Sequence, residues 1–396
     1  MHHFDQLDDD QLDALFHLRP EPFDRYDDLE TLATALGATL YMPATRPGLA
    51  DDLLRQRATG LTSSVICLED AIADEDLPSA QKHAGAQLRD LGRRDPDRTA
   101  IPLTFIRVRN PEQIGEIVAD LAEHADLLSG FVLPKFTATG GREYLEAIAQ
   151  ARAATGLRLR AMPVIESPEA IYAETRADLL AGVAGLLAAQ RESVLAVRLG
   201  ATDLSSAYGL RRSRDLTVYD VPLIASVITD VVNVLGRADG TGFVVTGPVW
   251  EHFPDQGRLF KPQLRQTPFV AQNAGRLRHR LVTRALDGLI RETALDKANG
   301  LTGKTVIHPT HVLAVHALSV VTHEEWSDAC DIVGHDMTGG GVRASQYGNK
   351  MNEAKPHRAW AERILRRASV FGVTRPEVGF VDLLIAGTQA AAAGSA

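Results

Sequence analysis

Short apolar runs rich in β-branched residues alternate along the chain with longer amphipathic stretches. The stretch that opens with Pro111 repeats apolar residues at helical spacing and places Ile114 and Val118 on one face. Ser167 before Pro168 is typical of a helix N-terminus. The apolar runs predict strands at 38–42, 64–68, 103–107, 130–133, 160–165, 195–199, 243–247 and 303–307. The pattern is therefore a repeated strand–helix unit.

Repetition of this unit eight times predicts a parallel sheet, because each parallel step needs a crossover connection. Eight units favour a closed (β/α)8 TIM barrel, an α/β fold, over an open doubly wound sheet. The first predicted strand is not followed by a G-x-G-x-x-G sequence, which agrees with the barrel.

The two ends of the chain do not follow the repeat. We expect an N-terminal helical extension at 1–35, a TIM-barrel catalytic domain at 36–320 and a C-terminal helical segment at 321–396. The glycine-rich stretch 338–350 is either a mobile lid over the barrel mouth or a linker to the polar helix expected near 355–368.

Composition excludes several classes of protein. The 396 residues carry a formal net charge of −9, which argues against a nucleic-acid partner. No apolar stretch reaches the ~18–20 residues that span a bilayer, and the N-terminus lacks the pattern of a signal peptide. Two cysteines provide no disulfide framework. We therefore expect a cytoplasmic protein with no membrane partner.

Charged side chains follow nearly every predicted strand. In a (β/α)8 enzyme the active site is built from the C-terminal ends of the strands, so these residues should meet at one rim. Ending so many buried strands in charge is costly unless the charges are paired or used. The residues in strand order are Glu69 and Asp70, Arg107, Lys135, Glu166, Asp203, Glu251 and His308.

Two of these residues suit a metal ion. Glu166 and Asp203 follow adjacent strands, and two carboxylates at one rim form a hard-oxygen site for Mg²⁺, with Mn²⁺ as the alternative. Either residue alone would more often be a helix cap or a salt-bridge partner. Arg107 offers a planar fork that can hold a substrate carboxylate.

The remaining rim residues have less specific roles. Lys135 either binds an anion or bridges the acidic residues, and Glu69 and Asp70 either orient metal-bound water or hold Arg107. Lys135 could also form a Schiff base, but acidic neighbours would raise its pKa, which is the wrong direction. For Arg109 we expect a surface ion pair.

Other catalytic classes are disfavoured. His308, His311 and His316 suggest zinc, but no cysteine accompanies them and His316 is offset; His308 before Pro309 more plausibly caps the rim. Cys67 lies among apolar residues and is expected to be an inert thiol. The absence of a G-x-S-x-G elbow and of a P-loop lowers the odds of a hydrolase or an NTPase.

Seven motifs in order resemble the HpcH/HpaI aldolase and citrate lyase β-subunit superfamily, and more particularly the C–C bond lyases associated with tellurium-resistance gene clusters. The resemblance spans about residues 38–365, and the order of the motifs makes it specific. The motifs are LYMPATRP (40–47), VICLEDAI (65–72), FIRVRN (105–110), VLPKF (132–136), VIESPEAI (164–171), LGATDLSSAYG (199–209) and GKTVIHPTHV (303–312).

This resemblance implies a TIM barrel that binds Mg²⁺ and cleaves or forms a carbon–carbon bond. The family's metal ligands fall on Glu166 and Asp203, and its substrate-contacting arginine falls on Arg107. The family's G-K-M-[VI]-D sequence, whose Asp reaches a neighbouring subunit's active site, reads GNKMNE here and places Glu353 at the acidic position. The resemblance also implies a homo-oligomer, a trimer or a hexamer.

The chain departs from the family at several positions. Cys67 replaces the first Asp of D-L-E-D, Arg109 replaces an Asn, and the Lys and Arg of the following helix are Leu77 and Gln81. These changes leave the metal ligands intact. They put the family's substrates in doubt, because the helix cations lie near the thioester in CoA-dependent relatives.

We therefore predict a Mg²⁺-dependent carbon–carbon lyase or aldolase. Its substrate carries a carboxylate, as a hydroxy or keto acid or as an acyl-CoA thioester, and reacts through a metal-stabilised enolate. We place Arg107, Asp70 and Glu353 in the catalytic set and Arg107, Lys135 and Glu69 in the substrate-binding set. A metal-bound water is the alternative to Glu353 as proton acceptor. A non-catalytic metal- or carboxylate-binding barrel in an assembly or stress-response complex is the alternative function, and the reaction direction stays open.

Overall fold

The computed structural model describes residues 1–253, 286–334 and 341–393. Within these ranges eight parallel strands form one sheet in the order β7-β6-β5-β4-β3-β2-β9-β8. A parallel bridge between Val197 and Val245 joins the two end strands. The sheet thus closes on itself, and the predicted (β/α)8 barrel is confirmed. Its strands are β2 (Ala38–Pro43), β3 (Ser63–Cys67), β4 (Leu103–Arg107), β5 (Leu128–Leu133), β6 (Arg160–Ile165), β7 (Arg198–Leu199), β8 (Gly247–Trp250) and β9 (Lys304–Val306).

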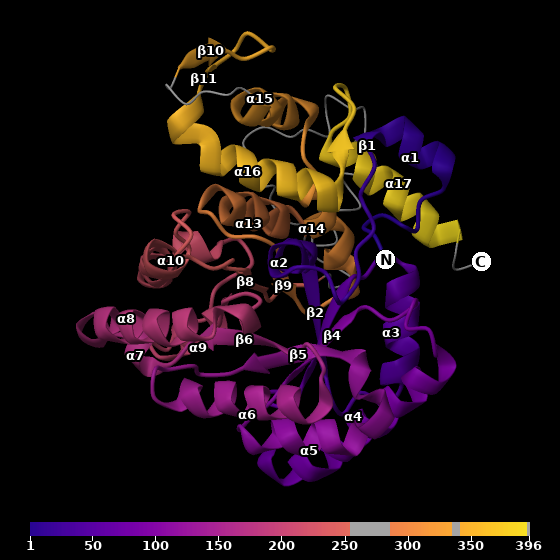
Figure 1. The fold of residues 1–396 in the computed structure, drawn as a ribbon, viewed down its shortest axis with the longest axis vertical. Helices are drawn as coiled ribbons and strands as arrows, with labels where there is room; N and C mark the ends of the chain where they lie inside the picture. The colour runs from indigo at the N-terminus through magenta and orange to yellow at the C-terminus, as the bar shows by residue number, and fades with distance from the viewer. Residues whose placement is uncertain (254–285, 335–340, 394–396) are drawn as a thin grey trace.

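Helices follow the strands and cover the outside of the barrel (Figure 1). They are α3 (Leu49–Ala58), α4 (Leu77–Arg94), α5 (Glu112–Leu121), α6 (Gly140–Thr155), α7 (Pro168–Ile171), α8 (Ala173–Ala189), α9 (Ala201–Ser206), α10 (Pro222–Leu235), α13 (Leu286–Ala298) and α14 (Val312–Ser319). Short 3₁₀ turns are η1 (Asp74–Asp76), η2 (Ala122–Leu127), η3 (Arg191–Ser193), η4 (Val218–Asp220) and η5 (Pro309–His311).

The barrel strands are buried on both faces, which explains why they read as continuous apolar runs in the sequence. Every residue of β3, β5 and β6 is buried. The outward side chains pack under the helices in one large hydrophobic core. The polar strand ends are therefore the exception that needs an explanation.

Two predicted strands differ from the structure in position. The run 243–247 was expected to be a strand, but β8 covers Gly247–Trp250, and within the earlier run Val245 makes only the closing bridge. The strand expected at 195–199 is regular only at Arg198–Leu199. An apolar run shows that a segment is buried and leaves open which of its residues join the ladder.

The two ends of the chain pack together beside the barrel (Figure 1). The segment 1–35 is not only helical as expected: α1 (Asp9–Leu15) and α2 (Leu29–Ala35) flank β1 (Phe16–Leu18), which pairs antiparallel with β12 (Val373–Thr374). The C-terminal part is mainly helical, with α15 (His323–Gly334), α16 (Ala354–Phe371) and α17 (Phe380–Ala393).

The glycine-rich stretch becomes, over its described part, a two-stranded hairpin of β10 (Val342–Ala344) and β11 (Met351–Glu353). Residues 338–340 of this stretch lie outside the described residues. The buried Asp328 of α15 accepts hydrogen bonds from Ser345 Oγ and Asn352 Nδ2, both at 2.7 Å. The hairpin is thereby tied to α15.

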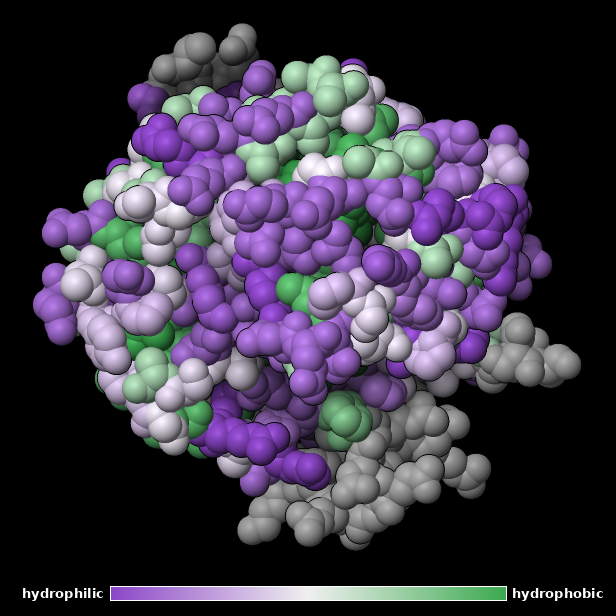
Figure 2. Space-filling view, turned by 90° about the horizontal axis from the view of Figure 1, so that it is seen from below, coloured by the Kyte–Doolittle hydropathy of each residue, from purple (hydrophilic) through white to green (hydrophobic). Residues whose placement is uncertain are grey.

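No helix of the described ranges is long and apolar enough to cross a bilayer. The face shown in Figure 2 is largely hydrophilic, with hydrophobic side chains scattered between the charged ones.

Candidate active site

The structure brings six of the predicted residues to the C-terminal end of the barrel. Glu69 and Asp70 follow β3, Arg107 ends β4, and Lys135 lies two residues beyond β5. Glu166 directly follows β6, and Asp203 lies in α9 after β7. We call these six residues the rim cluster: Glu69, Asp70, Arg107, Lys135, Glu166 and Asp203.

Arg107 lies at the centre of the rim cluster. Its Nη2 is 2.8 Å from Glu69 Oε2 and from Glu166 Oε1, and 3.4 Å from Asp70 Oδ2. Burial works against the charged guanidinium, but Glu166 and Glu69 outweigh it and raise the pKa of Arg107. Its buried Nε has no hydrogen-bond partner among the described residues. Nη2 thus contacts three carboxylates, whereas the N–H of Nε donates no hydrogen bond among the described residues.

Glu166 is the most buried carboxylate of the rim cluster, with 3% of its surface exposed. Its Oε1 accepts hydrogen bonds from Arg107 and from the backbone N–H of Lys135, the latter at 3.0 Å. A Cβ on Gly200 would lie 2.0 Å from Glu166 Oε2, so only glycine fits at this position beside the carboxylate. Burial raises the pKa of Glu166 to about 7; Arg107 opposes this, and Asp203 adds to it.

Lys135 bridges the two acids that follow β3. Its Nζ lies 2.7 Å from Glu69 Oε1 and 3.3 Å from Asp70 Oδ1. The hydrogen bond to Glu69 is the largest influence on the pKa of Lys135 and raises it. Lys135 is therefore held as an ammonium ion, a poor nucleophile for a Schiff base.

The adjacent carboxyl groups of Glu69 and Asp70 differ in character. Glu69 is buried, and burial raises its pKa. Asp70 is exposed; burial of part of its carboxyl opposes ionisation, but Glu69, Arg107 and Lys135 lower its pKa overall. The buried Glu69 thus forms ion pairs with both Arg107 and Lys135, whereas Asp70 is exposed to solvent.

The charges of the rim cluster do not balance. Two cations face four carboxylates, so full ionisation leaves two negative charges uncompensated. No group of three or more His, Cys, Asp or Glu side chains in the described ranges has a metal-binding arrangement. The charges of Glu166 and Asp203 nevertheless influence each other, and both hydrogen bonds that Glu166 accepts among the described residues fall on Oε1. Such a pair suits a Mg²⁺ ion that takes its other ligands from water and substrate.

Glu353 is not brought to the rim cluster by any contact among the described residues. It is the last residue of β11, and its backbone N–H donates to His357 Nδ1 at 3.1 Å. Its side chain is exposed on the hairpin. Within one copy of the chain, the expected catalytic role of Glu353 therefore has no geometric support.

Arg109 does more than the expected surface ion pair. Its Nη1 lies 2.5 Å from the exposed Asp74 Oδ1, and its Nη2 donates to the carbonyls of Ile72 at 2.6 Å and Glu69 at 3.1 Å. The replacement of the family's Asn by Arg109 thus fastens the loop that carries Glu69 and Asp70.

The three histidines show no zinc site in the described part of the chain. His308 caps η5, and its ring nitrogen accepts from the backbone N–H of Thr310. His316 Nε2 accepts from the backbone N–H of Ala38 at 3.1 Å, far down the barrel. Burial lowers the pKa of His311 to about 3. Cys67 is buried, and burial raises its thiol pKa, as expected for an inert thiol.

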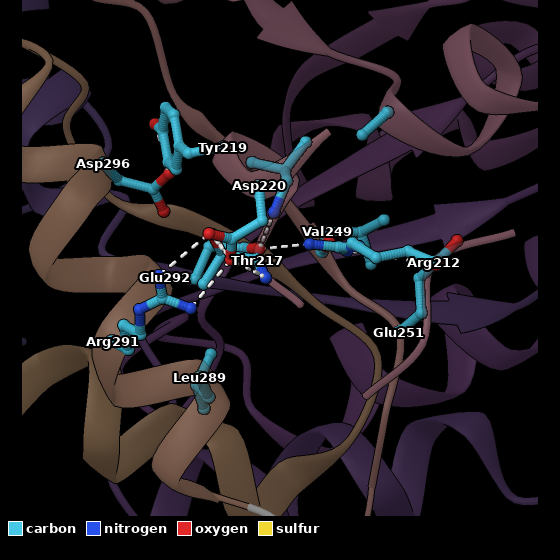
Figure 3. Close-up of polar contacts among 12 residues, drawn as sticks. Arg212, Thr217, Tyr219, Asp220, Val249, Glu251, Leu289, Arg291, Glu292 and Asp296 are labelled. Carbon is cyan, nitrogen blue, oxygen red and sulfur yellow. Dashed lines mark hydrogen bonds and ion pairs between the residues drawn. The ribbon is translucent and has the colours of Figure 1, made fainter. Parts of the chain in front are cut away.

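A second charged group was not anticipated from the sequence. We call it the buried cluster, and Figure 3 shows most of it. Lys304 Nζ lies 2.9 Å from Glu292 Oε1 and 2.6 Å from Asp296 Oδ2, Arg212 forms an ion pair with Glu292, and Tyr219 donates to Asp296 Oδ1 at 2.8 Å. Its members are Arg212, Tyr219, Glu292, Asp296 and Lys304. The signal for it was a lysine inside a predicted strand.

The buried cluster is linked to the rim through Arg212. Its Nη2 donates to the carbonyl of Val249 at 3.0 Å and lies 3.9 Å from Glu251 Oε2. Glu251 in turn accepts from Thr202 Oγ1 at 2.6 Å, and Thr202 immediately precedes Asp203. Glu251, which the sequence placed at the rim, therefore anchors the helix that carries Asp203.

Taken together, a closed barrel with a charged rim defines an enzyme-like site of the TIM-barrel class. The chain belongs to the C–C bond lyase family of the TIM-barrel fold, whose model matches residues 30–373. This finding identifies it as a member of a family of carbon–carbon lyases. No curated protein matches the chain.

One of the solved structures that match the chain agrees with it in fold over most of its length. CitE from Mycobacterium tuberculosis in complex with magnesium, acetoacetate and coenzyme A has a TM-score of 0.52 and 20% identity, over 85% of this chain and 99% of that one. The citrate lyase β subunit of the same organism with oxaloacetate and magnesium gives a TM-score of 0.43 and 20% identity, over 72% and 97%. Haloferax volcanii malate synthase with magnesium and glyoxylate gives 0.47 and 13%, over 70% and 73%.

Proposed function

We propose that this protein is a Mg²⁺-dependent carbon–carbon bond lyase that acts on a carboxylate-bearing hydroxy or keto acid. The observation that carries the proposal is the surplus of two carboxylates over cations in the rim cluster, which includes the buried Glu166, whose pKa is raised to about 7. A divalent cation would neutralise this surplus. Glu166 and Asp203 would hold Mg²⁺, with Mn²⁺ as a substitute.

The substrate would be held by Arg107 at the centre of the rim cluster. Glu69 and Glu166 hold its guanidinium in place, so the planar fork is preorganised to bind a substrate oxygen. When bound, Mg²⁺ supplies positive charge that stabilises the enolate produced by cleavage. Arg107 would add a preorganised donor for the negative charge of the enolate, and Lys135 would contribute a second positive charge at the rim.

We propose a free acid rather than a CoA thioester as the first substrate to test. CitE, the similar structure of M. tuberculosis, contains coenzyme A. In this chain the helix positions expected to face the thioester are Leu77 and Gln81. Gln81 is engaged with Glu116 and Gln113 at 2.9 and 2.8 Å, so neither position supplies a cation.

Glu353 would act in another copy of the chain. The β10–β11 hairpin presents it to solvent, away from any contact with its own rim cluster in the described residues. We propose a homo-oligomer, a trimer or a hexamer, in which Glu353 accepts the substrate hydroxyl proton at the neighbouring site. Glu353→Gln and Glu166→Gln would each be inactive, and mixing them would restore part of the activity. Mixed oligomers as inactive as the parents would contradict the shared site.

We also propose that the protein works in the cytoplasm, since both Cys67 and Cys330 are free thiols.

The function is tested by incubating the protein and Mg²⁺ with 4-hydroxy-2-keto acids and 3-hydroxy di- and tricarboxylic acids, as free acids and as CoA thioesters. Proton NMR would follow the release of a keto acid. We expect Mg²⁺-dependent cleavage of at least one compound, abolished by EDTA and by Glu166→Gln. Binding of these acids without cleavage of any would contradict the proposal and would favour a non-catalytic binding protein.

A further inference from the structure

Tyr41 lies on the inner face of the barrel, below the rim cluster. Its strand neighbours Leu40 and Met42 are 2% and 5% exposed and belong to the outer core, whereas Tyr41 is only partly buried. The parallel register places Tyr41 two residues before the level of Arg107. The Tyr41 ring therefore lines the floor of the barrel mouth.

Arg198 fills the barrel interior beside this ring. It comes from β7 and is 1% exposed. Its Nη2 donates to Thr305 Oγ1 of β9 at 2.6 Å, and its Nη1 lies 3.5 Å from Thr39 Oγ1 of β2 and 3.7 Å from Met162 Sδ of β6. Its Cζ is 5.4 Å from the centre of the Tyr41 ring. The guanidinium thus crosses the barrel under the site.

The charge of Arg198 has no carboxylate partner among the contacts of the described residues. The groups that it contacts are neutral, and its buried Nε has no hydrogen-bond partner there. A buried and unpaired cation is costly, so a structural role alone explains it poorly. A group that can become an anion does lie beside it: the Tyr41 hydroxyl acts on the Arg198 charge, and the guanidinium lies next to the Tyr41 ring.

We propose that Tyr41 is a further catalytic residue, whose hydroxyl protonates the enolate carbon left by cleavage, and that Arg198 is a positioning residue that stabilises the resulting phenolate. The inference rests on the proposed function. The O–H bond of Tyr41 breaks as a C–H bond forms at the enolate carbon. The negative charge passes to the phenolate oxygen, and water then returns a proton to it.

The environment of Tyr41 suits this step. Burial raises the pKa of Tyr41, so the hydroxyl keeps its proton at neutral pH and is available as an acid. Arg198 and Arg107 act in the opposite direction, which limits the cost of the transient phenolate. Tyr41 would thus supply the acid for the enolate, a role separate from the base that accepts the hydroxyl proton.

Pyruvate is a suitable probe, because its carboxylate and carbonyl can occupy the site and its methyl protons exchange through an enolate. The full-length protein with Mg²⁺ and pyruvate in ²H₂O would be followed by proton NMR, with the rate without protein subtracted. By microscopic reversibility the group that protonates the enolate carbon also removes the methyl proton. The variants are Tyr41→Phe, Glu166→Gln and, as a matched control, Tyr208→Phe, whose hydroxyl contacts only the carbonyl of Ile171 among the bonds of the described residues.

We expect Tyr41→Phe to slow the exchange by about 100-fold or more, the range of general acid–base catalysis. Calorimetric binding of pyruvate with Mg²⁺ should be unchanged, and Tyr208→Phe should exchange at the wild-type rate. Wild-type exchange in Tyr41→Phe, still abolished by Glu166→Gln, would overturn the role of Tyr41 and leave the proposed function standing. Absence of exchange in the wild-type protein despite bound pyruvate would overturn the proposed function for 4-hydroxy-2-keto acids, whose cleavage leaves the pyruvate enolate.

Arg198 is tested with the same probe. Arg198→Gln should lower the exchange rate at saturating pyruvate without changing the half-saturating concentration. Arg198→Lys should restore part of the rate, because it returns a positive charge beside Tyr41. A change confined to the half-saturating concentration would show that Arg198 binds substrate and would overturn the positioning role.

Discussion

The rim cluster and the buried cluster are built from the same kinds of side chain but differ in their balance of charge. In the buried cluster, Lys304 and Arg212 face Glu292 and Asp296, so charges balance within the protein. In the rim cluster two cations face four carboxylates, and the site is open to solvent at Asp70 and Lys135. We infer from this difference that the buried cluster stabilises the fold, and it is consistent with our proposal that a bound cation completes the rim cluster.

The largest effect should come from unbalancing the buried cluster. Lys304→Met would leave Glu292 and Asp296 buried without their shared cation, and we expect a loss of about 3–5 kcal/mol in the free energy of unfolding. Lys135→Met is the matched control in the rim cluster, where the lysine is half exposed and a loss below about 1 kcal/mol is expected. Urea denaturation measures both. Equal losses of unfolding free energy in the two variants would contradict the proposed difference between the clusters.

For catalysis, a substitution in the rim cluster should cost more than one in the buried cluster. Arg107→Lys keeps a positive charge but removes the planar fork, and we expect turnover to fall by about 10²–10³-fold. Steady-state kinetics on the substrate found above would measure it, with Arg212→Lys as the control from the buried cluster. A larger loss of turnover in Arg212→Lys than in Arg107→Lys would place the chemistry elsewhere.

A smaller effect concerns pH. Burial raises the pKa of Glu166 from 4.5 to about 7, so the metal-free native state holds a proton that the unfolded chain releases. This contribution to stability is complete below about pH 4.5 and is lost as the pH rises through about 7. Relative to wild type, metal-free Glu166→Gln should therefore gain on the order of 1–3 kcal/mol in unfolding free energy between pH 4 and pH 8. Parallel stability curves for the two proteins would contradict the raised pKa.

The barrel could be predicted because each strand and helix is indicated by the pattern of residues within its own segment. Each apolar run and each amphipathic stretch carries its own period, and the rule that active sites lie beyond strand ends located Arg107, Glu166 and Asp203 at one rim. The pairing of β1 with β12 could not be predicted, because Phe16 and Thr374 meet across the whole length of the chain and neither segment carries a pairing signal.

The same rule explains what sequence reasoning missed. The rule applies to charged residues at or beyond the ends of strands and does not cover those inside the strands. Arg198 and Lys304 lie within predicted strands, one facing the barrel interior and the other facing α13. A charged residue inside a predicted apolar strand is the available signal for both. Whether Glu353 reaches a neighbouring site depends on assembly, which no pattern in a single chain specifies.

The central claim is that Glu166 and Asp203 hold a divalent cation. Thermal unfolding with and without Mg²⁺ tests it on the wild-type protein, on Glu166→Gln/Asp203→Asn and on Glu353→Gln, a control that removes a carboxylate not proposed to bind the metal. At about 100 times the Kd, Mg²⁺ should stabilise the wild type and Glu353→Gln by roughly 2.7 kcal/mol and leave the double variant unchanged. Equal stabilisation of all three proteins, or of none, would contradict the assignment of the rim cluster as a metal site.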